Sequence, residues 1–290
     1  MSRYAKAHDL DSWQRDPRIA ARGFTHPWQS TVAAGNGEDA FIELVERYLQ
    51  PESAVLDLGC GHGEFTLLLA AKCRSIVGIE REPGYLELAR ELAAEKNAVN
   101  VQFFQVNLTG DNEEGRVFAG IPLPDKSIDL FVNRRGPLLC RYLAEALRVA
   151  RPGALIVGLH PGGNAPAPIW CDLLPEPYQK AVLGRFSFDE TASWVIEPLR
   201  AAGISDYRLW WLDVPEFLGT PHDLFARLDL VARLNMPQPA DAPAYQTIEP
   251  LLTKIFEQYG TLQGLILRHQ RLLWQARLPK RASSLPNPAT

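Results

Sequence analysis

Hydrophobic positions along the chain fall into two kinds of run. Short, mostly apolar runs predict buried strands at 54–58, 75–80, 101–108, 127–133 and 154–160. Between them, apolar residues recur every three to four positions, which predicts helices at 39–49, 64–73, 83–97 and 138–150. Strands that alternate with helices predict a doubly wound α/β fold, with a mostly parallel sheet covered on both faces.

The pattern changes after residue 160, where proline and glycine become frequent. We interpret residues 161–205 as an inserted cap of loops and broken helix. Periodicity then predicts helices at 188–203, 222–234 and 248–260, and strands at 206–214 and 262–278. Residues 1–37 are expected to form an irregular or partly helical arm, and 279–290 a disordered tail. The main domain is therefore expected to span residues 38–278.

Composition narrows the class of protein. The chain has 290 residues, is 46% hydrophobic and carries a net charge of −4. This acidic balance argues against a nucleic-acid-binding domain. No two of its four cysteines form a CxxC pair, so no metal site is expected, and free thiols are more plausible than a disulfide framework. The start lacks an apolar signal sequence and no segment could span a bilayer, so we expect a soluble cytoplasmic protein without a membrane partner.

A glycine loop stands between the first core strand and its helix, in the stretch VLDLGCGHGEFTLLL at residues 55–69. In open α/β sheets, ligands bind beyond the carboxyl ends of the strands. The spacing is GxGxG, not the GxGxxG of dinucleotide binders, and no GK[ST] follows, so pyrophosphate is not favoured. Asp57 suits a cationic ligand, and Glu80 at the end of the next strand can accept hydrogen bonds from ribose hydroxyls. Glycines here could also serve only a tight turn.

These stretches, together with LPDKSIDLFVN (123–133) and LRVARPGALIVGLH (147–160), resemble the class I S-adenosylmethionine-dependent methyltransferases. The resemblance covers about residues 38–160 and implies a Rossmann-like fold and S-adenosylmethionine as cofactor. It implies that the loop glycines pass under the methionine part, that Asp57 holds its amino group and that Glu80 binds the ribose. The cofactor-binding residues implied are Asp57, Gly59, Cys60, Gly61, Gly63, Glu80, Arg81, Asn107 and Asn133. Asn107 stands where the family usually has an aspartate; its amide can still accept a bond from adenine, but it lacks the charge.

The ends of the fourth and fifth strands are predicted to line an acceptor crevice. His160 there is a candidate general base, or a structural histidine that bonds a loop. Arg134 and Arg135 could bind a carboxylate or phosphate, and Asn133 could line the methyl-transfer cavity. The aromatic residues of the cap and arm are candidates to exclude water. The predicted acceptor-binding residues are Trp28, Arg134, Arg135, His160, Trp170 and Tyr178.

We therefore expect an enzyme that transfers a methyl group from S-adenosylmethionine to a small molecule by in-line displacement. Two alternatives remain: an rRNA or tRNA methyltransferase, which the charge disfavours, and a non-catalytic binding protein with this fold. Sulfonium methyl transfer needs a general base only when the nucleophile must lose a proton. The patterns therefore specify neither the acceptor atom (O, N, S or C) nor the oligomeric state.

Overall fold

The computed structural model describes residues 28, 30–32, 37–108, 120–161, 167–183, 188–235 and 242–280. Most of the arm predicted at 1–37 and of the tail predicted at 279–290 lies outside these residues. The chain divides into two compact units. The core unit consists of Phe41–His160, Ala192–Trp210 and Leu272–Thr290, and the accessory unit of Met1–Ala40, Pro161–Thr191 and Trp211–Arg271.

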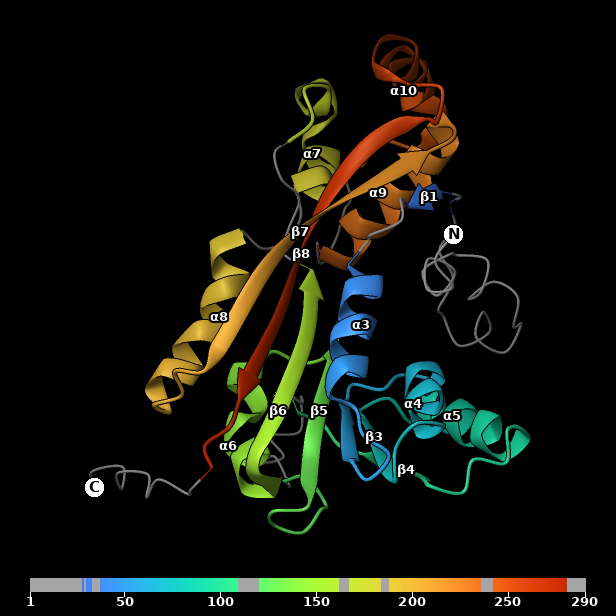
Figure 1. Ribbon diagram of the computed structural model, residues 1–290. Coiled ribbons are helices and arrows are strands. Elements are labelled where there is room, and N and C mark those ends of the chain that lie inside the picture. The colour runs from blue at the N-terminus through green and yellow to red at the C-terminus, as the bar shows by residue number, and fades with distance from the viewer. Residues whose placement is uncertain are drawn as a thin grey trace. The chain divides into compact units, whose positions relative to one another are not determined.

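Strands and helices alternate along the first half of the chain, as the hydrophobic pattern predicts (Figure 1). The elements are α3 (Glu38–Tyr48), β2 (Ala54–Leu58), α4 (Glu64–Ala70), β3 (Ser75–Glu80), α5 (Pro83–Glu95), β4 (Val101–Gln105), β5 (Ile128–Arg134), α6 (Leu139–Val149) and β6 (Ala150–Pro161). The strand pairs β2–β3, β3–β4, β2–β5 and β5–β6 are parallel. The predicted doubly wound, mostly parallel sheet is thereby confirmed.

The strand order of the sheet is β1-β7-β8-β6-β5-β2-β3-β4. Strand β2 therefore lies between β3, which follows it in sequence, and β5, which the chain reaches later. The connections leave β2 and β5 in opposite directions along the sheet. Such a switch point opens a crevice at the carboxyl ends of the strands, where ligands of α/β proteins bind. The glycine loop begins at this point, directly after Leu58.

The second half contains the 3₁₀ turn η2 (Cys171–Leu173) and the elements α7 (Glu176–Leu183), α8 (Phe188–Ala201), β7 (Tyr207–Leu218), α9 (Pro221–Asn235), α10 (Tyr245–Tyr259) and β8 (Leu265–Arg277). These agree in type with the predicted helices and strands. The unit boundary does not follow the predicted cap of 161–205, because residues from Ala192 onward cluster with the core unit. A capping role for this segment stays a prediction.

The arm was expected to be irregular or partly helical, and this is wrong for its described end. Residues Ser30–Val32 form strand β1, which pairs antiparallel with β7. Glu216 on β7 explains the pairing, because its carboxylate accepts hydrogen bonds from Trp28 Nε1 (3.0 Å) and Ser30 Oγ (2.7 Å). A buried tertiary contact of this kind leaves no periodic signal in a three-residue segment.

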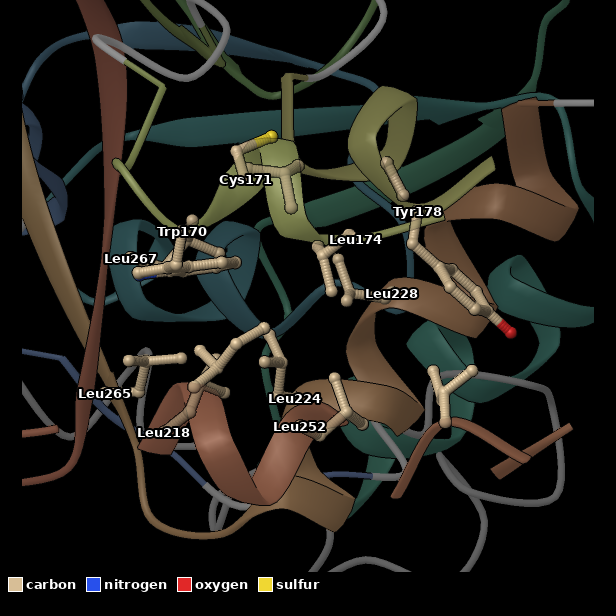
Figure 2. Packing of buried hydrophobic residues seen from close by; sticks show 14 of the residues in the cluster. Trp170, Cys171, Leu174, Tyr178, Leu218, Leu224, Leu228, Leu252, Leu265 and Leu267 are labelled. Carbon is tan, nitrogen blue, oxygen red and sulfur yellow. The ribbon is translucent and has the colours of Figure 1, made fainter. Parts of the chain in front are cut away.

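The accessory unit has its own hydrophobic core (Figure 2). Side chains from the segment after β6, from β7, α9 and α10 and from the start of β8 meet in it. Its members include Trp170, Cys171, Leu174, Tyr178, Leu218, Leu224, Leu228, Leu252, Leu265 and Leu267. Residues 170–182 of the predicted cap are thus packed on the second half of the chain by buried apolar side chains.

Candidate active site

The loop after β2 is held in a conformation that favours glycine. Gly59, Gly61 and Gly63 have φ angles of +75°, +55° and +79°, in the left-handed region that strains other residues. The backbone N–H groups of Gly59 and Cys60 both donate to the carbonyl oxygen of Ile79, at 2.9 and 3.0 Å. The loop is therefore anchored on the neighbouring strand β3.

The first and last glycines of the loop face different neighbours. A Cβ atom on Gly59 would lie 3.0 Å from Gly136 Cα, in the loop between β5 and α6. A Cβ atom on Gly63 would lie 2.9 Å from Ala89 Cβ and 3.0 Å from the ring of Phe103. Gly63, predicted to contact the cofactor, is thus required for packing against α5 and β4.

Glu80 fixes the loop from the end of β3. Its Oε2 accepts a hydrogen bond from the N–H of Gly61 at 3.1 Å. Its Oε1 accepts from the N–H groups of Arg81 (2.8 Å) and Glu82 (3.1 Å). These bonds set the orientation of the carboxylate, and a carboxylate oxygen has lone pairs for further donors. The side chain of Arg81 forms an ion pair with Glu82 at 3.0 Å and is largely exposed.

Asp57 supplies a second carboxylate, near the end of β2. It is 2% exposed, and its Oδ2 accepts a hydrogen bond from Thr66 Oγ1 at 2.7 Å. Burial raises the pKa of Asp57 to about 6, although the Thr66 bond and the charge of Arg134 act in the opposite direction. Sequence reasoning missed Thr66, whose only signal is its place in the first turn after the glycine loop.

Cys60 was predicted to bind the cofactor, and its thiol lies beside Gly78 of strand β3. A Cβ atom on Gly78 would be 2.8 Å from Cys60 Sγ, so the thiol occupies the space that this glycine leaves open. Cys60 packs against the small apolar cluster that includes Leu86 and Phe103. Burial raises the pKa of Cys60. The side chain is therefore packed between the loop and strand β3, and a contact of Cys60 with the cofactor stays a prediction.

Asn133 was predicted to line the methyl-transfer cavity, but its amide is engaged within the protein. Nδ2 donates to Pro137 O (2.6 Å) and Tyr142 Oη (2.9 Å), and Oδ1 accepts from Gly136 N–H (3.0 Å). The side chain is fully buried. Asn133 thus shapes the β5–α6 loop, and a contact with the cofactor or the methyl-transfer cavity stays a prediction. Tyr142, its partner on α6, was not predicted from the sequence.

The two arginines where β5 passes into this loop differ in environment. The guanidinium of Arg134 lies over the ring of Phe65, 4.9 Å from its centroid. Arg135 is exposed and has a φ of +60°, and its N–H donates to Leu159 O at 2.7 Å. The loop is therefore tied to β6. A contact of either arginine with the acceptor stays a prediction.

Asn107 lies two residues beyond the end of β4 and is partly exposed. The preceding residue, Val106, donates its N–H to the carbonyl oxygen of Glu80 at 2.9 Å. Asn107 therefore follows a contact with the end of β3, on the same edge of the sheet as the glycine loop. Its role with adenine stays a prediction.

The remaining predicted residues divide between the two units. His160, near the end of β6, is 2% exposed and stacks on Trp274 of the core unit. Burial lowers the pKa of His160 to about 4. Trp28, Trp170 and Tyr178 are buried in the accessory unit. The indole of Trp28 donates to Glu216 and the hydroxyl of Tyr178 to Pro243 O at 2.6 Å, so contact of these three with an acceptor stays a prediction.

Two further features of the described part of the chain bear on function. None of its helices is both long and apolar enough to cross a membrane. Within the same residues, no group of three or more His, Cys, Asp or Glu side chains is arranged to hold a metal ion.

Comparisons with known proteins agree with this geometry. Residues 49–174 match a family described as a methyltransferase domain. The 23S rRNA (uracil(1939)-C(5))-methyltransferase RlmD of Klebsiella pneumoniae (strain 342) is 51% identical over 63 residues, which are 22% of this chain but only 14% of that relative. The chain thus matches a short part of such curated relatives.

Two crystal structures share the fold. A functionally unknown protein from Deinococcus radiodurans R1 has a TM-score of 0.55 and 22% identity, covering 92% of this chain and 99% of that one. A candidate methyltransferase from Bacillus halodurans C-125 has a TM-score of 0.50 and 15% identity, covering 83% and 99%. Residues 49–174 thus carry a methyltransferase domain, and the fold is that of the class I S-adenosylmethionine-dependent methyltransferases.

The residues present fit the cofactor of this class. S-adenosylmethionine carries a cationic amino group and a ribose with two hydroxyls, which call for carboxylates. Asp57 and Glu80 provide carboxylates at the ends of adjacent parallel strands, with the glycine loop between them in sequence. The chemistry of this donor set therefore matches the group to be bound.

Proposed function

We propose that the chain transfers the methyl group of S-adenosylmethionine to a small-molecule acceptor. The observation that carries the proposal is the glycine loop held between two carboxylates. The N–H of Gly61 is bonded to Glu80, and Asp57 is buried on the strand that leads into the loop. Asp57 would hold the amino group of the cofactor, and Glu80 the ribose.

The cofactor supplies an electrophilic sulfonium methyl group. The protein's contribution is to bind and orient both reactants, because an in-line displacement depends on alignment and on the exclusion of water. Asn133 would act indirectly, by holding the β5–α6 loop against Gly59 through Gly136. A neutral His160 could accept a proton from an acceptor that must lose one.

Methylation of RNA is the second candidate function, because the curated relatives named above act on 23S rRNA. The matched stretch covers only 14% of the relative, so it supports a shared cofactor domain more than a shared acceptor. The net charge of −4 also disfavours a phosphate-binding surface. An RNA-binding chain would lose affinity for RNA steeply as salt increases.

Calorimetric titration with S-adenosylmethionine tests the proposed function. We expect Glu80→Gln to weaken binding by about 1.5–3 kcal/mol, because a charged hydrogen-bond acceptor is lost. Glu82→Gln is the matched control: this glutamate is two residues along the same turn, and its exposed side chain pairs with Arg81. Equal affinity of wild type and Glu80→Gln would refute the assignment, and absence of binding by wild type would refute the function.

A further inference from the structure

Several buried polar atoms in the described part of the chain have no hydrogen-bond partner, and two of them in the core unit belong to neighbouring rings. These two atoms are Nε2 of His160 on β6 and Nε1 of Trp274 on β8. The side chains are 2% and 0% exposed. Their rings are nearly parallel, with centroids 6.2 Å apart and planes inclined by 16°. The two unpartnered atoms therefore belong to one stacked pair.

Gly158 makes room for this pair. A Cβ atom there would lie 2.3 Å from Trp274 Nε1 and Cε2, so any other residue would displace the indole. Gly158 and His160 are two residues apart on β6 and thus face the same side of the sheet. The backbone at Gly158 therefore packs directly against the indole nitrogen, on the face that carries His160.

The pair lies toward the edge of the sheet where the glycine loop begins. Asp57 pairs in register with Val132, and Val132 with Val157. His160 is three residues beyond Val157 in the direction of the carboxyl ends of the parallel strands. Ligands of open α/β sheets bind at this edge.

Unpartnered buried polar atoms are uncommon in proteins, and each requires an explanation such as a functional role or a bound water. An apolar ring would have filled either position without leaving a polar atom unsatisfied. Most of the other buried side chains on β6 and β8 are apolar. Two polar rings side by side point to a polar partner that comes from outside the chain.

We propose that His160 and Trp274 form the recognition site for an uncharged hydroxyl group of the acceptor. This inference rests on the proposed methyl transfer, because it names a part of that acceptor. The indole N–H can only donate a hydrogen bond, whereas a ring nitrogen of neutral imidazole can accept one. A hydroxyl group can accept from the first and donate to the second. A carboxylate would lose its hydration without gaining a charged partner from either ring.

The test uses the full chain with ¹⁵N-labelled tryptophan, whose indole N–H signals are followed by NMR. The chain has 7 tryptophans, and the signal of Trp274 is the one that disappears in Trp274→Phe. The probes are phenol, toluene and benzoate. We expect phenol to shift the Trp274 signal saturably and with about 2–10-fold higher affinity than toluene, since toluene lacks the hydroxyl. His160→Phe should weaken phenol binding by a similar factor, and benzoate should bind more weakly than phenol.

Thermal unfolding of the ligand-free protein gives a second readout. Trp274→Phe keeps a large ring but removes the unpartnered N–H, so we expect its Tm to rise by roughly 2–4 °C. Trp210→Phe, at a partly exposed indole of the core unit, is the control and should leave Tm and phenol binding unchanged.

The proposal is overturned if phenol leaves the Trp274 signal unmoved, as a bound water would, or if toluene or benzoate binds as well as phenol. A fall in Tm on Trp274→Phe would also overturn it, because the indole would then serve packing alone. The titration of the wild-type protein with phenol remains a valid test even if a variant fails to fold. Binding of S-adenosylmethionine is measured separately by calorimetry, and its absence would refute the proposed function. The NMR signal of Trp274 would still show whether phenol binds at the ring pair.

Discussion

Gly136 is the residue whose substitution by alanine is expected to disturb the site most. It lies in the β5–α6 loop, and a Cβ atom there would be 2.2 Å from the carbonyl oxygen of Leu58 and 2.7 Å from Asn133 Oδ1. Ordinary contacts begin at 3.4 Å, so the two loops would have to separate by about 1 Å. Leu58 is the residue directly before Gly59, so the separation acts on the start of the glycine loop.

The expected loss of stability follows from these contacts. Overpacking against backbone costs about 1–3 kcal/mol. Displacing the Gly136 N–H from Asn133 Oδ1 removes a hydrogen bond worth about 0.5–1.5 kcal/mol. We therefore expect Gly136→Ala to reduce the free energy of unfolding by about 2–4 kcal/mol in urea denaturation. We also expect affinity for S-adenosylmethionine to fall at least tenfold in calorimetry, because a shift of about 1 Å misplaces the binding loop.

Gly84→Ala is the matched control. Gly84 is in the first turn of α5, and a Cβ atom there would meet nothing within 4 Å. Alanine should be neutral at this position or stabilise the helix by up to about 1 kcal/mol. If Gly136→Ala matched wild type in both stability and affinity, the close approach of the two loops would not determine the site.

Two further predictions concern buried carboxylates. The folded pKa of Asp57 is raised from 3.8 to about 6. Wild-type affinity for the cationic cofactor should therefore fall as pH drops below 6, by up to roughly tenfold per pH unit. The affinity of Asp57→Asn should be nearly independent of pH when both proteins are titrated by calorimetry between about pH 5 and 8. In Glu216, burial opposes ionisation, but the bonds from His269 and Ser30 and the charge of Arg227 outweigh it and lower the pKa. Its stabilising contribution is therefore present above the unfolded value of 4.5 and lost as pH falls below it. Glu216→Gln should cost about 3–5 kcal/mol in urea denaturation at pH 7, with a smaller loss at pH 4, and an equal loss at both pH values would contradict this reasoning.

The order of elements in the core unit was predictable because its strands are buried on both faces. Runs such as VLDL or SIVGIE carry a signal that few loops imitate. Boundaries were less predictable, because they depend on hydrogen bonds to neighbours. Strand β4 ends at Gln105, three residues before the predicted end, since its partner β3 ends at Glu80. Strand β1 was missed because a distant carboxylate on β7 holds it.

For the site, the sequence indicated which loop binds but not which atoms face the ligand. Cys60 and Asn133 belong to the expected motifs, but the sequence did not indicate that the thiol packs beside Gly78 or that the amide bonds Pro137 and Tyr142. Both outcomes depend on contacts between segments far apart in sequence. Trp274 gave no sequence signal, because an aromatic residue in a buried strand is normally part of the core.

The geometry of the glycine loop depends on residues that need not touch the cofactor. Glu80 bonds the amide of Gly61, Ile79 accepts from two loop amides, and Gly136 abuts the carbonyl of Leu58. Three neighbouring segments thus determine one short loop, whose glycines have few conformational restrictions of their own. A substitution in any of these segments should therefore change cofactor affinity by more than the loss of the substituted residue's own contacts with the cofactor would. Arg135 lies in the β5–α6 loop and Arg134 is the last residue of β5, so a change in this loop would reach the cofactor half and the predicted acceptor half of the site together.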